Sequence, residues 1–317
     1  MVNNQNMAHI YIYSPSGAVR DKAGFKRGIQ RLQALGHEVE VDPDALASHT
    51  RFAGDDATRL AAIERAAHSG AHLAMTSRGG YGLTRLLPQL PYAALDAAVK
   101  NGTQFIGLSD FTAMQLALLA QTGTPTWAGP AVLEDFACGA DEEPDEIMQA
   151  CLDDLLQGVG EGTGWRLPPA DLRSHPELTN PDGWSVDNAT LWGGNLSVLC
   201  ALLGTPYFPQ INNGILFVED VNEHPYRIER MLTQLLYAGV LGRQQAIVLG
   251  QFNHYQLTQH DKGYKLATAV DWLRCQLKVP VLTGLPFGHV PTKVVLPVGL
   301  PVQLLVQGRD ALVFWGD

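Results

Sequence analysis

Short apolar runs alternate with segments of helical periodicity through the first half of the chain, and this alternation restricts the fold more than any other feature. Strands are predicted over residues 9–14, 37–41, 72–77 and 104–108. Helices are predicted over residues 22–35, 58–69, 84–90 and 110–122. Strands that alternate with helices of this length are typical of βαβ units and a parallel sheet. We therefore expect an N-terminal α/β domain.

The pattern changes after residue 141. A helix is predicted over 142–157, and the stretch 158–183 is then dense in glycine, proline and other turn formers, which is typical of an interdomain connection. Further helices are predicted over 193–203, 226–237 and 264–277, and further strands over 214–218 and 245–250. Three short strands with Gly and Pro turns are predicted between residues 293 and 314. Such an ending indicates a β-rich, partly closed domain.

These patterns predict an α/β protein of two domains. The first, residues 8–160, is expected to be Rossmann-like or flavodoxin-like with a parallel sheet, and residues 161–187 are expected to be a linker. The second, residues 188–317, is expected to be smaller, β-rich and barrel-like. The length of 317 residues fits this division, because domains typically hold about 100–200 residues.

The composition excludes several classes of protein. Hydrophobic residues make up 46% and charged residues 17% of the chain, as in a globular protein with a sizeable core. The net charge of −10 argues against non-specific binding to nucleic acid or to an anionic membrane, since both favour a basic face. The cysteines form no CxxC pair, so reduced thiols are expected rather than a zinc site or a disulfide framework. They are Cys138, Cys151, Cys200 and Cys275.

The N-terminal sequence MVNNQNMAHIYIYSPSG does not look like a secretory signal, because it lacks a basic region, an apolar stretch and a small-residue cleavage site. No apolar run reaches the roughly 18 residues needed to span a bilayer. We therefore expect a cytoplasmic protein that does not contact a membrane.

Ser109 lies where a predicted buried strand meets a predicted helix, in QFIGLSDFTAMQ. A tight turn at this place projects a serine Oγ outward, and free N–H groups at the helix start can face an oxyanion. The segment resembles a nucleophile elbow but departs from G-x-S-x-G, because Phe111 stands in place of the second glycine. The alternative is that Ser109 only caps the helix, since serine is a preferred N-cap residue.

The loop RGGYG, residues 78–82, follows another predicted strand. Its three glycines let the backbone approach a ligand closely, and the Gly80 N–H is the candidate donor to an oxyanion. The loop is not a P-loop, because no Gly-Lys-Ser/Thr sequence follows. A plain turn is the alternative interpretation.

Two further segments supply a carboxylate and an imidazole. Glu219 ends an apolar strand in GILFVEDVNEHP, where α/β folds build sites, although it could be merely solvated. His289 lies in the loop GLPFGH, which glycine and proline shape. Together with Ser109 these residues are the groups of a Ser–His–carboxylate hydrolase, in which the histidine removes the serine proton and the carboxylate orients the imidazole. The pattern alone does not show that they meet in space.

These stretches together resemble the LD-carboxypeptidase family of serine peptidases, the muramoyltetrapeptide carboxypeptidases of peptidase family S66. The resemblance runs from SPSG at 14–17 to PVG at 297–299. In family order, the matching stretches between these limits are RGGYG, RLL, GLSDFTA, WAGP, LWGGNL, LGTP, ILFVEDVNEHPYRIERML and TGLPFGH. The long stretch VEDVNEHPYRIERML is most similar to the cytoplasmic enterobacterial-type enzyme.

The resemblance implies that Ser109 is the nucleophile, Glu219 the orienting glutamate and His289 the base. It implies that the backbone N–H groups of Asp110 and Gly80 are the oxyanion donors. The implied reaction removes the terminal D-alanine from a murein tetrapeptide during peptidoglycan recycling in the cytoplasm. The family is commonly homodimeric and needs neither a metal ion nor an organic cofactor.

Arg78 is the candidate for the group that faces the terminal carboxylate of the substrate, because a guanidinium matches carboxylate geometry. It could instead brace its own loop. Because Ser109 precedes the predicted linker while Glu219 and His289 follow it, we expect the active site at the interface between the domains.

Two other functions remain open from the sequence. An immunity-type relative would use the same triad to cleave an amide in a toxic aminoacyl-nucleotide antibiotic, and would be expected to carry an aromatic nucleotide-stacking loop that cannot be assigned here. A non-catalytic α/β protein would bind a nucleotide phosphate at RGGYG and would use Ser109 only as a helix cap.

Overall fold

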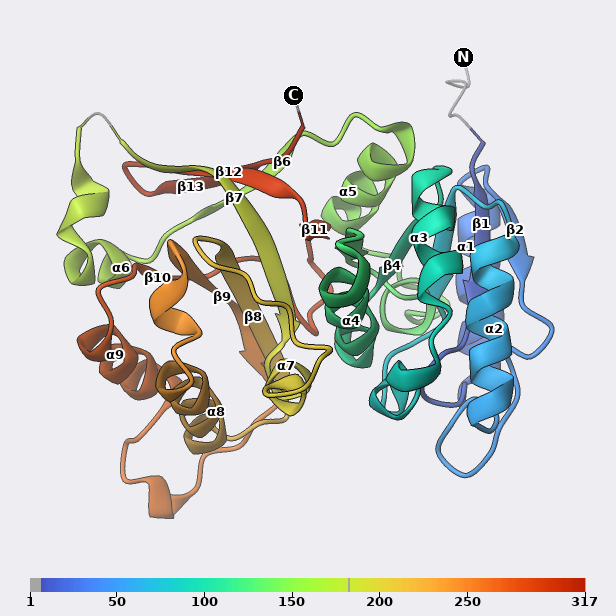
Figure 1. Cartoon of the computed structure of the whole chain (residues 1–317), viewed down its shortest axis with the longest axis horizontal. Helices are drawn as coiled ribbons and strands as arrows, with labels where there is room; N and C mark the ends of the chain where they lie inside the picture. Colours follow the sequence, from blue (N-terminus) through green and yellow to red (C-terminus); the bar gives the residue numbers. More distant parts are fainter. Residues whose placement is uncertain (1–6, 182, 317) are drawn as a thin grey trace. The chain divides into compact units, whose positions relative to one another are not determined.

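The computed structural model describes residues 7–181 and 183–316, and the chain forms two compact units (Figure 1). The first unit comprises Met1–Gly160 with the later segments Gly204–Pro209 and Pro291–Leu296. The second comprises Glu161–Leu203, Gln210–Val290 and Pro297–Asp317. Two short segments from the second half of the sequence therefore belong to the first unit.

A six-stranded sheet forms the centre of the first unit. Its order is β11-β5-β4-β3-β1-β2, and the neighbouring pairs from β2 to β5 all run parallel. The strands are β1 (His9–Tyr13), β2 (Glu38–Val41), β3 (Leu73–Thr76), β4 (Gln104–Gly107), β5 (Thr126–Ala128) and β11 (Leu296–Val298). The α/β class and the four strands predicted in this half are confirmed. The additional strand β5 has only three residues, too few to show a periodic pattern.

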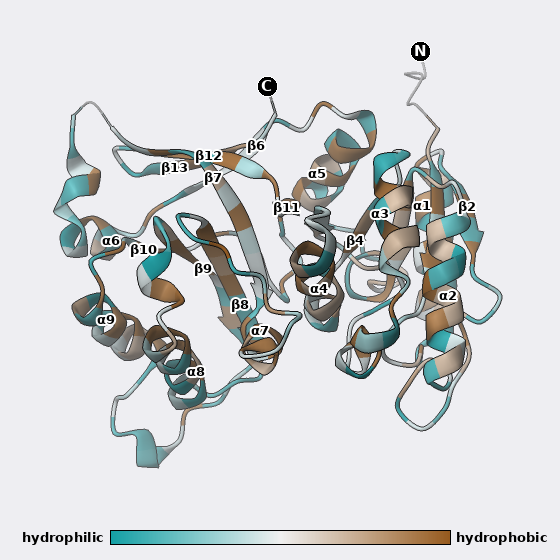
Figure 2. Ribbon diagram, in the orientation of Figure 1, coloured by the Kyte–Doolittle hydropathy of each residue, from teal (hydrophilic) through white to brown (hydrophobic). Residues whose placement is uncertain are grey.

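Helices cover both faces of this sheet. Apolar side chains of α1 (Lys22–Ala34) and α5 (Glu146–Gln157) share one core with side chains of β1, β3 and β4. Figure 1 shows α2 (Asp56–His68), α3 (Tyr92–Lys100) and α4 (Thr112–Thr122) side by side on the opposite face. Figure 2 shows hydrophobic colours along α4, in agreement with the burial of every residue from Thr112 to Leu119.

Local chemistry sets the helix ends in this unit. Asp55 begins α2 by accepting the Thr58 N–H at 2.8 Å, and Gly123 ends α4 in the left-handed conformation with a φ of 72°. The helix predicted over 84–90 consists instead of two 3₁₀ turns, Leu83–Arg85 and Leu87–Gln89. Pro88 explains the difference, because proline has no N–H to donate within a helix.

The second unit contains a seven-stranded mixed sheet in the order β10-β9-β8-β7-β12-β13-β6. The strands are β6 (Gly162–Arg166), β7 (Trp184–Asn195), β8 (Ile215–Val221), β9 (Ala246–Asn253), β10 (Val281–Thr283), β12 (Pro301–Gln307) and β13 (Asp310–Phe314). The helices are α6 (Pro169–Ser174), α7 (Leu196–Leu202), α8 (Pro225–Tyr237) and α9 (Leu266–Gln276). Strands β7 to β10 pair in parallel, and β12 pairs antiparallel with both β7 and β13. Figure 2 shows hydrophobic colours along the interior strand β8, whose first six residues are buried.

The helix predicted over 193–203 begins later than expected. Gly193 and Gly194 belong to β7 and have φ values of 140° and 130°, so α7 starts only at Leu196. A Cβ at Gly193 would lie 1.8 Å from the Phe217 carbonyl oxygen of β8. The two glycines therefore serve a close backbone approach between strands, not a helix start.

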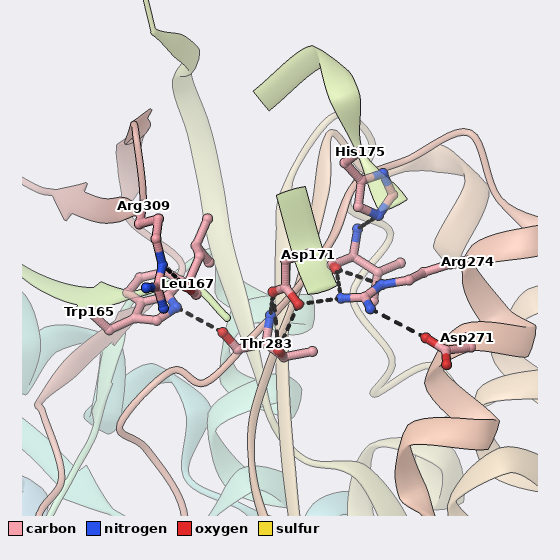
Figure 3. A network of polar contacts seen from close by, with 9 residues as sticks. Trp165, Leu167, Asp171, His175, Asp271, Arg274, Thr283 and Arg309 are labelled. Carbon is pink, nitrogen blue, oxygen red and sulfur yellow. Dashed lines mark hydrogen bonds and ion pairs between the residues drawn. The ribbon is translucent and has the colours of Figure 1, made fainter. Parts of the chain in front are cut away.

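The stretch 161–187, predicted as a linker, is instead part of the second unit. It supplies β6, which pairs with β13, and α6, and it enters β7. Figure 3 shows how polar contacts fix it: the Asp171 carboxylate accepts the Thr283 N–H at 2.6 Å and an Arg274 N–H at 2.7 Å. The Trp165 Nε1–H of β6 donates to the Thr283 carbonyl at the end of β10, at 3.0 Å. The first and last strands of the sheet order, β10 and β6, therefore approach each other.

The segment Pro291–Leu296 is anchored in the first unit by a buried ion pair. Lys293 Nζ contacts the Asp135 carboxylate, and both side chains are almost fully buried. The other Asp135 oxygen accepts the Ala131 N–H at 2.8 Å. Val295 joins the core formed by α1, α5 and the sheet. The domain boundary predicted before residue 188 misses this return of the chain, because a segment of six residues has no compositional signature.

Candidate active site

Ser109 follows β4 after one residue, Leu108, and begins a short helical turn that continues into α4. Its φ of 66° lies in the left-handed region, which costs a non-glycine residue about 1–3 kcal/mol. A strained serine between a strand and a helix is the geometry of a nucleophile elbow. A Cβ at Gly107 would lie 2.7 Å from the Phe111 ring, so the aromatic residue that breaks the G-x-S-x-G pattern packs against the glycine before the serine.

The RGGYG loop packs directly on Ser109. A Cβ at Gly79 would lie 2.7 Å from Ser109 Cβ and 3.0 Å from its Oγ, so the contact requires glycine. The Gly79 N–H donates to Glu134 Oε1 at 3.2 Å, and its carbonyl accepts the Gly17 N–H at 3.2 Å. Gly80 follows with a φ of 117°. The loop that carries the predicted Gly80 donor is thus held on both sides next to the predicted nucleophile.

The Asp110 carboxylate ties together the loops around Ser109. Its Oδ2 accepts the Ser16 Oγ–H at 2.8 Å and the Leu83 N–H at 2.9 Å. The side chain is buried, and burial raises the pKa of this carboxyl despite the hydrogen bonds. The Asp110 N–H belongs to the first turn of a helix, where amides have no intrahelical acceptor. The Asp110 side chain therefore fixes the surrounding loops, and its N–H lies at a helix start, as the predicted role of oxyanion donor requires.

His289 and Glu219 form a hydrogen-bonded pair in the second unit. Glu219 lies at the carboxyl end of β8 and is fully buried, and its Oε2 accepts from His289 Nδ1 at 2.8 Å. An ionised carboxylate only accepts hydrogen bonds, so this contact assigns the proton to Nδ1 and leaves Nε2 as a proton acceptor. This is the orientation that a general base in a Ser–His–carboxylate triad requires.

Strand β9 holds the loop that carries His289. The Gln251 N–H donates to the Phe287 carbonyl at 2.8 Å, and Asn253 Nδ2 donates to the His289 carbonyl at 2.6 Å. A Cβ at Gly250 would lie 2.5 Å from the Phe287 carbonyl oxygen, and Gly288 adopts a φ of 142°. The loop therefore lies flat against β9, and the imidazole is fixed by its backbone as well as by Glu219.

Comparison with known proteins identifies the family. A family model for the LD-carboxypeptidase N-terminal domain matches residues 10–129, and one for the C-terminal domain matches residues 188–304. This chain belongs to the LD-carboxypeptidase family. It is accordingly a serine-type peptidase, as the sequence motifs predict, and the predicted nucleophile lies in one matched domain and the predicted base in the other.

Relatives of this chain include solved structures. The crystal structure of a muramoyltetrapeptide carboxypeptidase from Oxalobacter formigenes is similar over 98% of this chain and 99% of that chain, with 38% identity and a TM-score of 0.82. A protein of Synechocystis sp. that carries the provisional name carboxypeptidase is 31% identical over 299 residues, 92% of this chain and 90% of that protein. The microcin C7 self-immunity protein MccF of Escherichia coli is 27% identical over 256 residues, 74% of this chain and 72% of that protein.

A second carboxylate lies beside Glu219. Asn195 Nδ2, at the end of β7, donates to Glu219 Oε1 at 3.1 Å and to Asp220 Oδ1 at 3.0 Å. Asp220 also accepts the N–H groups of Val221 and Ser197. Burial and the adjacent Glu219 charge raise the pKa of Asp220 to about 6. One amide therefore fixes two buried carboxylates, and the Glu219 side chain has partners on both oxygens.

Arg78 lies in the first unit beside the Gly79 contact. The side chain is half-buried, and its Nη1 donates to the Ala18 carbonyl at 3.4 Å. The nearby Glu134 keeps exposed surface, yet desolvation by the surrounding protein and the charge of Asp135 raise the pKa of its carboxyl. Glu134 projects from a five-residue π-helix, Val132–Phe136, and such turns occur frequently at functional sites.

Sequence reasoning missed the residues that support the predicted catalytic groups in each unit. Ser16, Glu134 and Asn195 contact the loops or carboxylates that hold the predicted catalytic groups. Ser16 and Asn195 lie in SPSG and LWGGNL, two of the stretches that carry the family resemblance. The sequence therefore marked both segments, but it did not show the hydrogen bonds that these side chains make. Among residues 7–181 and 183–316, no cluster of His, Cys, Asp and Glu could hold a metal ion. In the same residues no helix is long and apolar enough to cross a bilayer.

Proposed function

We propose that this chain removes the terminal D-alanine from murein tetrapeptides through an acyl-enzyme intermediate. The hydrogen bond between Glu219 and His289 carries the proposal, because it prepares an imidazole to accept a proton at Nε2. The strained turn at Ser109 supports the same chemistry. The similarity to the muramoyltetrapeptide carboxypeptidase of O. formigenes supports the choice of substrate.

In the proposed first step, Ser109 Oγ attacks the carbonyl carbon of the bond between the L-centre of the diamino acid and D-alanine. His289 Nε2 takes the serine proton, and Glu219 stabilises the imidazolium that forms. The N–H groups of Asp110 and Gly80 hold the negative oxygen of the tetrahedral intermediate; the loss of one such donor typically costs about 10²–10³ in rate.

The intermediate then collapses. The imidazolium gives its proton to the amide nitrogen, the C–N bond breaks, and D-alanine leaves with a neutral amine while the peptide stays as an ester on Ser109. Water next attacks the ester, His289 takes a proton from the water, and the serine regains its proton as the tripeptide departs. The mechanism requires His289 Nε2 to reach Ser109 Oγ during turnover.

Three further elements belong to this proposal. Arg78 would face the terminal carboxylate of the tetrapeptide, because a guanidinium binds a carboxylate through paired N–H groups. The enzyme would act in the cytoplasm on recycled murein peptides and would form a homodimer. Light scattering of the purified protein tests the dimer, and its mass at one chain would contradict it.

The central experiment is mass spectrometry of a murein tetrapeptide incubated with the purified protein, to detect the loss of one alanine. Ser109→Ala should reduce release to the background of about 10³–10⁴ over water that triad-deleted enzymes retain. Ser185→Ala, an exposed serine on β7, serves as the matched control and should keep full activity. Wild-type rates in the Ser109→Ala protein would show that Ser109 is not the nucleophile.

A second candidate function follows from the similarity to MccF. A solved structure of MccF in complex with glutamyl sulfamoyl guanosine has a TM-score of 0.82 at 23% identity, which shows a shared fold. The alternative reaction is cleavage of the amide in an aminoacyl-nucleotide antibiotic by the same three groups. Turnover of an aminoacyl sulfamoyl adenylate faster than of a murein tetrapeptide would favour it.

A further inference from the structure

A small pocket in the first unit opens beside the loop that carries Gly80. Its volume is about 170 Å³, and three arginines and a tyrosine line it: Arg20, Arg51, Arg78 and Tyr81. Gly17 and Gly80 contribute backbone to the wall. A Cβ at Gly80 would lie 3.1 Å from Gly17 Cα, so the two loops meet there without side chains between them. No carboxylate is among the lining residues.

The three guanidinium groups lack ion-pair partners in the part of the chain that the structure describes. Arg20 donates only to neutral acceptors, the Thr50 carbonyl and Ser48 Oγ. The Arg78 Nε is buried and has no hydrogen-bond acceptor among the described residues. The positive charge of Arg78 acts on the Glu134 carboxyl without a direct ion pair between them. A protein of net charge −10 thus keeps three cations around one small cavity, which favours an anionic ligand.

The side chains around the pocket are held in place. The Arg51 guanidinium stacks over the Tyr81 ring at 5.5 Å, and the Tyr81 ring lies 5.9 Å from that of Phe52. The Arg51 carbonyl accepts the Ala18 N–H at 3.0 Å, which joins the two loops that carry Arg20 and Arg51. A prepared arrangement of this kind loses little side-chain entropy when an anion binds.

We propose that this pocket binds the free carboxylate of the substrate's terminal D-amino acid, and that Arg20 and Arg51 restrict cleavage to peptides with an unblocked C-terminus. The inference rests on the proposed function and extends it beyond Arg78. In such a peptide the carboxylate is separated from the scissile carbonyl carbon only by the amide nitrogen and one Cα. The pocket borders Gly80, the proposed oxyanion donor, so an anion held there would lie near the reacting bond of the proposed reaction.

Hydrolysis of two matched peptides tests the assignment. One is a murein tetrapeptide that ends in D-alanine, and the other is the same peptide ending in D-alaninamide. Arg51→Gln and Arg20→Gln should each lower kcat/KM for the acid by about 10- to 100-fold and leave that for the amide nearly unchanged, because a lost charge-assisted hydrogen bond affects only the carboxylate. Arg230→Gln, an exposed arginine on α8, is the control for lost charge and should change neither value.

A binding experiment separates this inference from the proposed function. N-acetyl-D-alanine and N-acetyl-D-alaninamide are titrated into the Ser109→Ala protein and followed by NMR, with and without Arg51→Gln. If the acid binds preferentially and Arg51→Gln abolishes this preference, the pocket assignment is supported. It is supported even if no tetrapeptide is cleaved, because the lack of cleavage would overturn only the proposed function. Equal binding of acid and amide, or an acid/amide ratio of kcat/KM that neither arginine variant changes, overturns the pocket assignment while D-alanine release stands.

Discussion

The contact between Gly79 and Ser109 gives a sharp prediction for Gly79→Ala. An added Cβ would lie 2.7 Å from Ser109 Cβ, whereas ordinary contacts begin near 3.4 Å, so one of the two loops must move by about 0.7 Å. Gly79 is fixed through its N–H to Glu134 and through its carbonyl to Gly17, so the shift falls at least partly on the serine. Misplacement by about 1 Å can cost about 10²-fold in rate, and we expect a loss of kcat of that order.

The assay is the release of D-alanine from a murein tetrapeptide, with kcat and KM measured separately, together with thermal unfolding. Gly242→Ala is the matched control, because its Cβ meets nothing within 4 Å and neither glycine has a left-handed φ. The control should keep its activity and be unchanged or slightly more stable. A Gly79→Ala enzyme that stays within about threefold of wild-type kcat would refute the reasoning, since the clash would then be absorbed away from the nucleophile.

Three further predictions concern buried polar groups. Lys293→Met removes the cation beside the buried Asp135 carboxylate and should cost about 3–5 kcal/mol in urea unfolding, whereas Lys293→Met with Asp135→Asn should recover much of that loss. The raised pKa of Asp220, about 6, stabilises the native state at low pH, and that contribution is lost as the pH rises through 6. The difference between the unfolding free energies of Asp220→Asn and wild type should therefore shift in favour of the variant by up to about 2–3 kcal/mol between pH 4 and pH 7. A difference that does not change with pH would show that Asp220 is not the titrating group. Asn195→Ala should lower kcat by about tenfold or more with little change in KM, because Glu219 loses the amide that holds its second oxygen, and an unchanged kcat would contradict that role.

The parallel sheet could be predicted from the sequence because its strands repeat a strong local signal. Residues 9–14 and 104–108 are apolar runs bounded by turn formers, and the structure places both in the first sheet as β1 and β4. The strand β7 (Trp184–Asn195) could not be predicted in the same way. Its first half alternates exposed and buried residues with polar side chains, and its end consists of two glycines whose reason is a contact with the Phe217 carbonyl. That contact joins residues far apart in the sequence.

The candidate site likewise combines residues that short sequence motifs single out with contacts between residues far apart in the sequence. The sequence singles out Ser109, Glu219 and His289 because each stands near the end of an element in a short motif. The pairing of His289 with Glu219 depends on β9, which holds the histidine loop against the end of β8, and no spacing in the sequence encodes that contact. The arginine pocket likewise draws Arg20, Arg51 and Arg78 from three loops. Only Arg78 belongs to a motif that the sequence singles out.

The sequence GLSDF can depart from G-x-S-x-G because neighbouring glycines provide the space around Ser109. In an elbow, small residues beside the nucleophile allow the helix to start close to the strand. Here that space is provided by Gly107 on the strand and by Gly79 on the neighbouring loop, which contact the Phe111 ring and Ser109 Cβ respectively. Phe111 can therefore be large, and its burial contributes apolar contacts that offset the strain at Ser109. The turn requires space beside Ser109, and the two glycines of G-x-S-x-G are one of several ways to provide it.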